Sequence, residues 1–252
     1  MMIQRKTNYR ENHESTTNPF YAGARIFNKG ESMTEEKQTL AMDGARFFGE
    51  MTASISHEIK NVMAIINENA GLLEDMVAMN QQGMPFPAER IDKLAQSVAR
   101  QIARADEIIQ TMNRFAHSAD HARETLDAGE MVQFVINLTS RLTMLQGARF
   151  DFSAPEKPVT TAANRFFLAY LIWRGMAAAM EISQADESIR MRVETTENGP
   201  CLAFSGVGRN DAFSAGSLSA LKDSDVLILL DARLVLHPEK GEFRIFFSKK
   251  YD

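Results

Sequence analysis

Residues 54–61, Ser-Ile-Ser-His-Glu-Ile-Lys-Asn, hold the side chains of this chain that are best suited to chemistry. His57 lies two residues after Ile55 and two before Ile59. On a helix that turns about 100° per residue, His57 points about 200° away from Ile55, so a buried face through the two isoleucines leaves the imidazole in solvent. A neutral imidazole has a free nitrogen lone pair near pH 7 and is a nucleophile toward phosphorus. The pattern therefore predicts an exposed histidine that can accept a phosphoryl group.

Two polar neighbours extend this candidate site. Glu58 follows His57 directly, and Asn61 lies one helical turn after it on the same face. A carboxylate beside the ring can orient it and keep a proton on the second nitrogen, while the carboxamide of Asn61 can position a water molecule. An exposed histidine on a helix is more often an ordinary solvated side chain, so the spacing alone does not establish catalysis.

These residues lie within the first of two apolar stripes that have helical spacing. The first stripe consists of Phe48, Met51, Ile55, Ile59, Val62, Ile66, Asn69, Leu73 and Met76. The second consists of Ile91, Leu94, Val98, Ile102, Ala105, Ile109, Met112 and Ala116. Between them, Gly83, Pro85 and Pro87 interrupt the chain. Residues 33–125 are therefore predicted to form two long helices, each of roughly 45–65 Å, that fold back antiparallel.

A hairpin of this length cannot cover both apolar stripes by itself. Pairing two hairpins into a four-helix bundle would bury them, so the pattern predicts a homodimer. The alternative is a monomeric hairpin that packs on its own C-terminal domain.

The C-terminal half has a different texture, in which short alternating segments are mixed with helical ones. Strands are predicted at residues 148–153, 188–194, 201–204 and 242–247, and helices at 131–145, 165–182 and 224–236. Helices interleaved with mostly antiparallel strands indicate an α/β sandwich over residues 126–252, and the fold class of the whole chain is α+β. Residues 1–32 are polar and weakly patterned, which is typical of a flexible tail.

Composition narrows the classes of function. A formal net charge of −5 gives no general electrostatic reason to bind nucleic acid. The single cysteine, Cys201, excludes an internal disulfide framework and fits a reducing compartment. No apolar run approaches the roughly 20 residues that span a bilayer, and the N-terminus lacks the apolar core of a secretory signal. We expect a cytoplasmic protein without membrane insertion.

One histidine pair outside the candidate site has a spacing known from metal sites. His117 and His121 are four residues apart and could clamp a metal on one helix face. No third ligand is evidently placed to complete the site, although Asp120 lies between them. We therefore interpret the pair as the polar end of the second helix and predict no metal.

The segment Ser-His-Glu-Ile-Lys-Asn at residues 56–61 resembles the H-box of bacterial sensor histidine kinases. The predicted hairpin, over about residues 42–119, is similar to their dimerisation and histidine-phosphotransfer domain. The resemblance implies that His57 is phosphorylated, that Glu58 assists, and that Asn61 serves phosphatase activity toward a response regulator. The family usually has proline after the asparagine, whereas this chain has Val62, which predicts a straighter helix.

The C-terminal segment resembles the ATP-binding domain of the same family in element order, but its nucleotide positions are degenerate. Residues 164–179 correspond to the helix called the N-box, where Ala178 stands in place of the Mg²⁺-binding asparagine and Arg174 in place of another. A methyl group cannot ligate a hard cation. The family's Asp-x-Gly-x-Gly box corresponds to Ser205-Gly206-Val207-Gly208, which keeps both glycines and lacks the carboxylate.

The glycine-rich lid of the family is reduced to one glycine in residues 216–221. The resemblance therefore implies that ATP is not bound productively, that no cofactor is needed, and that autokinase activity is lost. This combination is closest in character to the histidine phosphotransferases of phosphorelays. Its implied partners are the receiver domains of response regulators and, as a further candidate, a sensor kinase. Two alternatives stay open: a divergent ATP-dependent sensor kinase, and a non-catalytic adaptor that binds response regulators.

Overall fold

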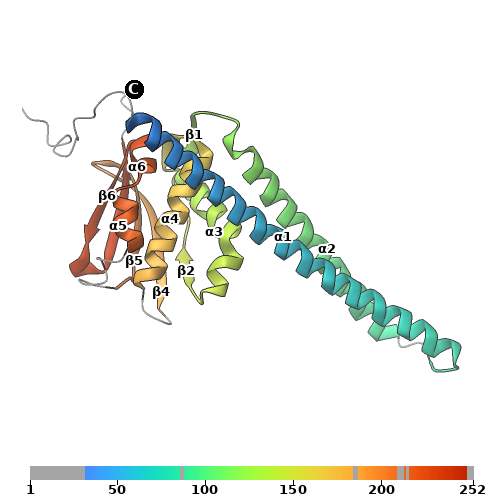
Figure 1. The fold of residues 1–252 in the computed structure, drawn as a ribbon. Helices are drawn as coiled ribbons and strands as arrows, with labels where there is room; N and C mark the ends of the chain where they lie inside the picture. Colours follow the sequence, from blue (N-terminus) through green and yellow to red (C-terminus); the bar gives the residue numbers. More distant parts are fainter. Residues whose placement is uncertain (1–31, 86–87, 184–186, 209–212, 214–215, 249–252) are drawn as a thin grey trace, which may run out of the picture.

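The computed structural model describes residues 32–85, 88–183, 187–208, 213 and 216–248. A long helical hairpin projects from a layered unit of helices and strands, as Figure 1 shows. The hairpin consists of α1 (Ser32–Gln81) and α2 (Ala88–Ala116), and a short 3₁₀ helix, η2 (His117–Ala119), leads out of it. The predicted α+β class is confirmed. The predicted tail, 1–32, lies outside the described residues except for Ser32, which begins α1.

The two hairpin helices are antiparallel and unequal in length. α1 has 50 residues, or about 75 Å at 1.5 Å per residue, and is longer than predicted. α2 has 29 residues, or about 44 Å. Near the base of the hairpin, the rings of Phe47 and Phe115 lie 5.4 Å apart. Farther out, Asn69 Nδ2 donates to Ser97 Oγ at 3.3 Å, which fixes the register of the two helices.

The second unit is a five-stranded sheet covered on one face by helices, with a separate strand pair. Its elements are β1 (Glu124–Asp127), α3 (Ala128–Leu145), β2 (Arg149–Phe152), β3 (Thr160–Ala163), α4 (Arg165–Ile182), β4 (Ser188–Thr196), β5 (Gly199–Ser205), α5 (Gly216–Lys222), α6 (Asp225–Leu229), β6 (Ala232–His237), η4 (Pro238–Lys240) and β7 (Glu242–Phe247). The sheet order is β2-β4-β5-β7-β6; β2 is parallel to β4 and the other pairs are antiparallel. β1 pairs with β3 alone.

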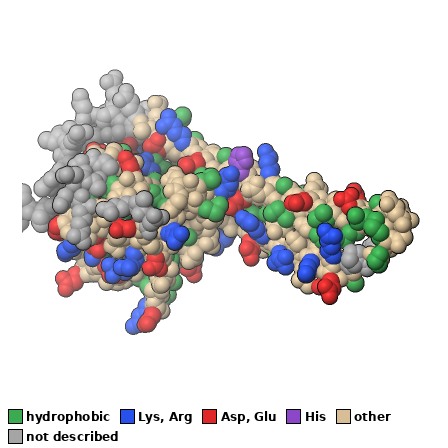
Figure 2. Space-filling view, turned by 90° about the horizontal axis from the view of Figure 1, so that it is seen from below, with side chains coloured by type: hydrophobic (Ala, Val, Ile, Leu, Met, Phe, Trp, Pro, Cys, Tyr) green, Lys and Arg blue, Asp and Glu red, His purple; other side chains and the backbone are tan. Residues whose placement is uncertain are grey.

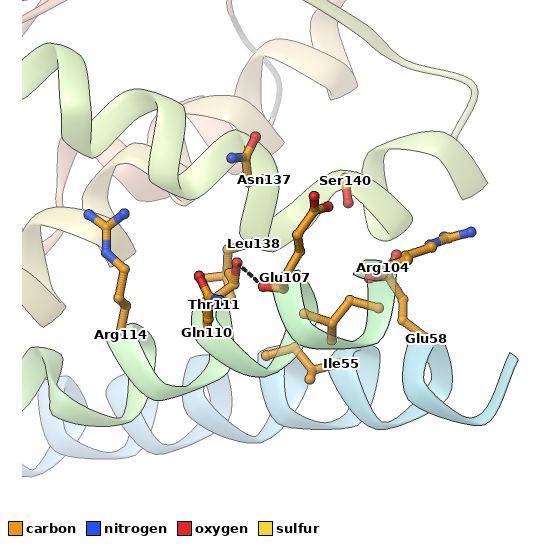
Figure 3. A pocket seen from close by; sticks show the side chains of 11 residues that line it. Ile55, Glu58, Arg104, Glu107, Gln110, Thr111, Arg114, Asn137, Leu138 and Ser140 are labelled. Atoms are coloured by element: carbon orange, nitrogen blue, oxygen red, sulfur yellow. Dashed lines mark hydrogen bonds between the residues drawn. The ribbon is translucent and has the colours of Figure 1, made fainter. Parts of the chain in front are cut away.

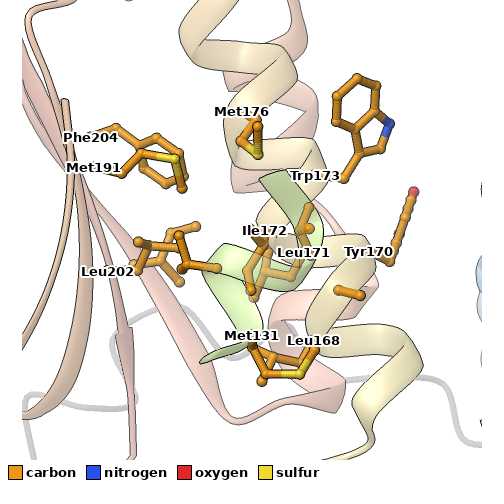
Figure 4. Close-up of a cluster of buried hydrophobic side chains, with 14 of the residues drawn as sticks. Met131, Leu168, Tyr170, Leu171, Ile172, Trp173, Met176, Met191, Leu202 and Phe204 are labelled. Carbon is orange, nitrogen blue, oxygen red and sulfur yellow. The ribbon is translucent and has the colours of Figure 1, made fainter. Parts of the chain in front are cut away.

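The core of this unit lies between α4 and the sheet. Figure 4 shows side chains of α4 facing Leu202 and Phe204 of β5. Gly175 allows this close approach, because a Cβ there would lie 2.7 Å from the Phe204 ring. Tyr170 and Trp173 of α4 are also buried.

A cluster of aromatic rings joins the base of the hairpin to α4. Phe166 of α4 lies 5.5 Å from Phe47 and 5.9 Å from Phe115, measured between ring centroids. Tyr170 lies 5.4 Å from Phe47. Gly44 of α1 leaves room for this contact, since a Cβ there would meet the Phe166 ring at 3.2 Å. The hairpin base and the second unit therefore share one core.

Several predicted boundaries are wrong. The predicted helix at 224–236 is two elements: α6 ends at Leu229, and β6 pairs with β7 along its whole length. Between them Asp231 has a φ of 48°, which turns the chain out of the helix. β1, β3 and α5 were not predicted. The division of the chain between residues 125 and 126 stays a prediction. Phe48 was predicted to begin the first buried stripe, but its side chain is 44% exposed. Phe47, which is 2% exposed, faces the core instead.

Candidate functional site

His57 lies on the exposed side of α1. Its side chain is exposed, whereas that of Ile55 is only 4% exposed and Ile59 is half-buried. The predicted exposure of His57 is therefore confirmed, because the two isoleucines face the interior as their helical spacing requires. Whether His57 carries a phosphoryl group stays a prediction.

The helix around His57 is continuous, and two hydroxyl groups near His57 bond to backbone carbonyl oxygens of the same helix. The hydroxyl of Ser56 donates to the carbonyl oxygen of Thr52 at 2.8 Å, and the hydroxyl of Thr52 donates to that of Phe48 at 2.7 Å. Val62, at the position where the resemblance places a proline, is fully buried and leaves α1 unbroken. An unbroken helical segment therefore presents the imidazole.

The two predicted partners of His57 differ in their surroundings. Asn61 is exposed, like His57, on the outer side of α1. Glu58 is half-buried and lines a cavity that α1 forms with α2 and α3. Neither side chain is hydrogen-bonded to His57 within the part of the chain that the structure describes. The structure thus brings Asn61 and His57 to one open surface, with Glu58 at the inner border of that surface.

The two degenerate positions on α4 are occupied by internal packing. Ala178 is fully buried in the core. Arg174 is half-buried, and its Nη1 donates to the Tyr170 hydroxyl at 2.7 Å. Burial raises the pKa of that hydroxyl. Neither position offers an oxygen ligand to a metal ion.

The two residues before Gly206 lie on opposite faces of the sheet. Ser205 pairs with Arg190 of β4 and lies on the face of the sheet turned away from α4. The residue two before Gly206, which matches the aspartate when both glycines are kept in place, is Phe204. Phe204 is fully buried, faces α4 and stacks on Phe243 at 4.6 Å. Counting back from the glycines in the sequence could have identified this residue.

After β5, Gly206, Gly208 and Ser217 make close contacts with neighbouring elements. Gly206 has a φ of +77°, and a Cβ there would lie 2.9 Å from the Ser188 carbonyl oxygen. The Gly208 amide donates to the carbonyl oxygen of Ile182, the last residue of α4, at 2.7 Å. The Ser217 amide, in the first turn of α5, donates to Glu181 Oε2 at 3.0 Å. The Ser217 amide is therefore already hydrogen-bonded to a protein carboxylate, in the region where the resemblance places the phosphate lid.

The residues considered for metal or thiol chemistry lie in ordinary surroundings. α2 ends at Ala116 and η2 at Ala119, so His117 and His121 do not share the face of one α-helix. His117 Nδ1 lies 2.8 Å from Asp120 Oδ2. No group of three or more metal-ligand side chains lies together among the described residues. Burial raises the pKa of the Cys201 thiol to about 12, which suppresses its reactivity.

Comparisons with known proteins give distant structural similarity only. No protein-family model matches the chain, and no curated protein matches it. The structure is similar to the histidine kinase AdeS of Acinetobacter baumannii, at 13% identity and a TM-score of 0.40 over 77% of this chain and 98% of that one. It is also similar to the histidine kinase ThkA in complex with the response regulator protein TrrA, at 16% identity and a TM-score of 0.39 over 89% and 68%.

The cytoplasmic segment of the histidine kinase QseC gives 10% identity and a TM-score of 0.39 over 59% of this chain and 95% of that one. TM-scores this low assign no residue role to the present chain. Separately, none of the described helices combines the length and apolarity that crossing a membrane requires.

Proposed function

We propose that this chain is a histidine phosphotransfer protein, or a phosphatase of the same type, in two-component signalling. His57 carries the phosphoryl group, and Glu58 and Asn61 assist. The observation that carries the proposal is the exposure of His57 on an unbroken helix whose neighbouring Ile55 is buried. A receiver domain can approach such a ring without unfolding any part of the chain.

The proposed chemistry is transfer between an aspartyl phosphate of a receiver and the imidazole of His57. A ring nitrogen attacks phosphorus, the P–O bond to the aspartyl group breaks, and the free carboxylate leaves while a P–N bond forms. The second ring nitrogen keeps its proton. Glu58, the next residue in the sequence, stabilises the positive charge that develops on the ring. In the phosphatase reaction, which replaces transfer to His57, Asn61 positions the water molecule near the aspartyl phosphate of the receiver.

The proposal also holds that the chain does not bind ATP productively. Support comes from Ala178, which has no oxygen ligand, and from Phe204, whose ring fills the space against Gly175. The Glu181 carboxylate at the start of α5 adds a negative charge that would repel phosphate groups.

The proposal includes a homodimer formed through the hairpin. Large apolar side chains are exposed on both helices: Phe48, Met63, Leu72, Val77, Met79, Ile102, Ile109 and Met112. Figure 2 shows hydrophobic side chains among charged ones along the projecting hairpin. Three of the exposed residues belong to the predicted second stripe, and Ile102 is 56% exposed. The alternative, packing on the chain's own second unit, covers only the base of the hairpin.

The test is incubation of the full chain with a panel of phosphorylated receiver domains, followed by detection of acid-labile phosphohistidine. We expect label on the wild type and on His117→Ala, which removes another exposed histidine, and none on His57→Ala. Failure of every receiver to label the chain or to lose phosphate faster in its presence would contradict the proposal and favour an adaptor. Label from ATP that disappears in His57→Ala would instead identify a divergent kinase.

A further inference from the structure

A cavity of about 450 Å³ lies between the hairpin and the second unit. Figure 3 shows its walls, which are formed by α1, α2 and α3. Its volume is within the range of small-molecule sites, roughly 300–1,000 Å³. Ile55 and Leu138 give it an apolar floor, and most of its other lining residues are polar.

The cavity holds charges of both signs that the protein does not pair with each other. Glu107 extends from α2 toward α3, with Arg114 on one side of it and Arg104 on the other (Figure 3). Arg114 is held in place because its guanidinium lies 4.9 Å from the centre of the Phe134 ring. Among the described residues, no ion pair engages Glu107, Arg104 or Arg114. All three side chains are exposed, so a charged ligand can reach them without breaking an ion pair within the described chain.

Neutral hydrogen-bonding groups complete the lining on the side of α3. Asn137 accepts a bond from Gln133 Nε2 at 2.9 Å, which orients its carboxamide and leaves the amide hydrogens available. The Ser140 hydroxyl is one helical turn away and also lines the cavity. Two carboxylates, Glu58 and Glu107, face the same space, which disfavours a phosphate or another purely anionic ligand.

We infer that this cavity is a binding site for a small zwitterion of the short-peptide class. The ligand carboxylate binds Arg114, its ammonium group binds Glu107, and Asn137 and Ser140 bond its polar backbone. Glu107 and Arg114 are seven residues apart, or about 10.5 Å along the axis of α2, so a ligand with separated charges fits better than a single α-amino acid. The site does not depend on phosphotransfer at His57.

The test uses glycylglycine as the probe and isothermal titration of the full-length protein. We expect saturable binding to the wild type, weakened about tenfold or more in Glu107→Gln and in Arg114→Gln, since each loses a charge-assisted hydrogen bond. N-acetylglycylglycine, which lacks the ammonium group, and glycylglycine amide, which lacks the carboxylate, should bind the wild type weakly by the same margin.

Matched controls are Glu89→Gln and Arg100→Gln, which change exposed charges of α2 outside the cavity and should keep wild-type affinity. Circular dichroism checks that each variant is folded. The inference is overturned if neither glycylglycine nor triglycine binds saturably, or if the blocked peptides bind as tightly as the free one. It is also overturned if the control variants weaken binding as much as the cavity variants. Phosphotransfer from receivers is measured separately, so either proposal can fail alone.

Discussion

Helices α2 and α4 differ in how much of their surface is buried. In α2 the buried residues are Leu94, Ile108 and Phe115, which form a narrow seam against α1. In α4 the residues from Leu168 to Trp173 are all buried in succession, so the helix is enclosed on nearly every side. A helix with a bare face can offer side chains to a partner, whereas an enclosed helix can serve only the fold. The comparison agrees with the proposal that recognition takes place on the hairpin, and it assigns stability to the second unit.

The largest expected effect concerns α1, which forms the exposed hairpin together with α2. His57→Gln should abolish acid-labile phosphate without changing the thermal unfolding midpoint, because the ring is exposed and makes no hydrogen bond with a described residue. Phosphohistidine detection and a melting curve on the same sample measure both quantities. His117→Gln is the matched control and should retain full labelling. A large drop in melting temperature for His57→Gln would show that the histidine serves the fold, and the contrast between the hairpin and the second unit would be lost.

The next effect concerns the packing of β5 against the enclosed helix α4. Phe204→Ala should lower the free energy of unfolding by about 3–5 kcal/mol, because it removes a ring that packs on Gly175 and Phe243. Urea denaturation followed by circular dichroism measures the change. The variant should not gain ATP binding, since Ala178 still lacks an oxygen ligand. Saturable ATP binding by Phe204→Ala would mean that the ring alone closes a working nucleotide site.

A third effect tests whether the bare hairpin faces pair with each other. The double substitution Ile102→Glu and Ile109→Glu should weaken dimerisation by at least about tenfold, because it places charges on apolar side chains that the single chain leaves exposed. Sedimentation velocity over a range of concentrations measures the dissociation constant. Ile228→Glu changes an exposed apolar residue of α6 instead and should leave dimerisation unchanged. A wild-type chain that is monomeric at every concentration would contradict the homodimer.

How far the sequence predicted the molecule depended on how local each signal was. The helix at 165–182 and the strand at 242–247 were predicted with the observed bounds, because a strong apolar pattern marks the helix and alternation marks the strand. The orientation of His57 followed from helical spacing in the same way. β6 was missed because its pairing with β7 outweighs the local pattern, and that pairing depends on the turn at Asp231.

Local sequence patterns could not predict the aromatic cluster that joins the hairpin to α4, or the cavity between α1, α2 and α3. Phe47, Phe115 and Phe166 lie far apart in the sequence and meet only when the hairpin packs on α4. Glu107 on α2 and Asn137 on α3 face one cavity for the same reason. Periodicity gives the buried side of each helix but not which helix covers it, so such contacts need the tertiary structure.

The smallest expected effect lies where the chain leaves the hairpin for the second unit. Arg165 donates to both carboxylate oxygens of Glu124, each at 3.0 Å, and these hydrogen bonds hold the pKa of Glu124 below its ordinary value of 4.5. A lowered folded-state pKa means that the pair stabilises the fold above the unfolded pKa, and that this contribution is lost as the pH falls through the folded value.

Because both side chains are partly exposed, we expect Glu124→Gln to cost less than about 1 kcal/mol at pH 7 and nothing at a pH below the folded pKa. Urea midpoints of wild type and variant at neutral and acidic pH measure the difference. Glu50→Gln, on an exposed position of α1, should show no such pH-dependent difference from the wild type. A difference between Glu124→Gln and the wild type that persists at acidic pH would mean that packing, rather than charge, holds β1 to α4.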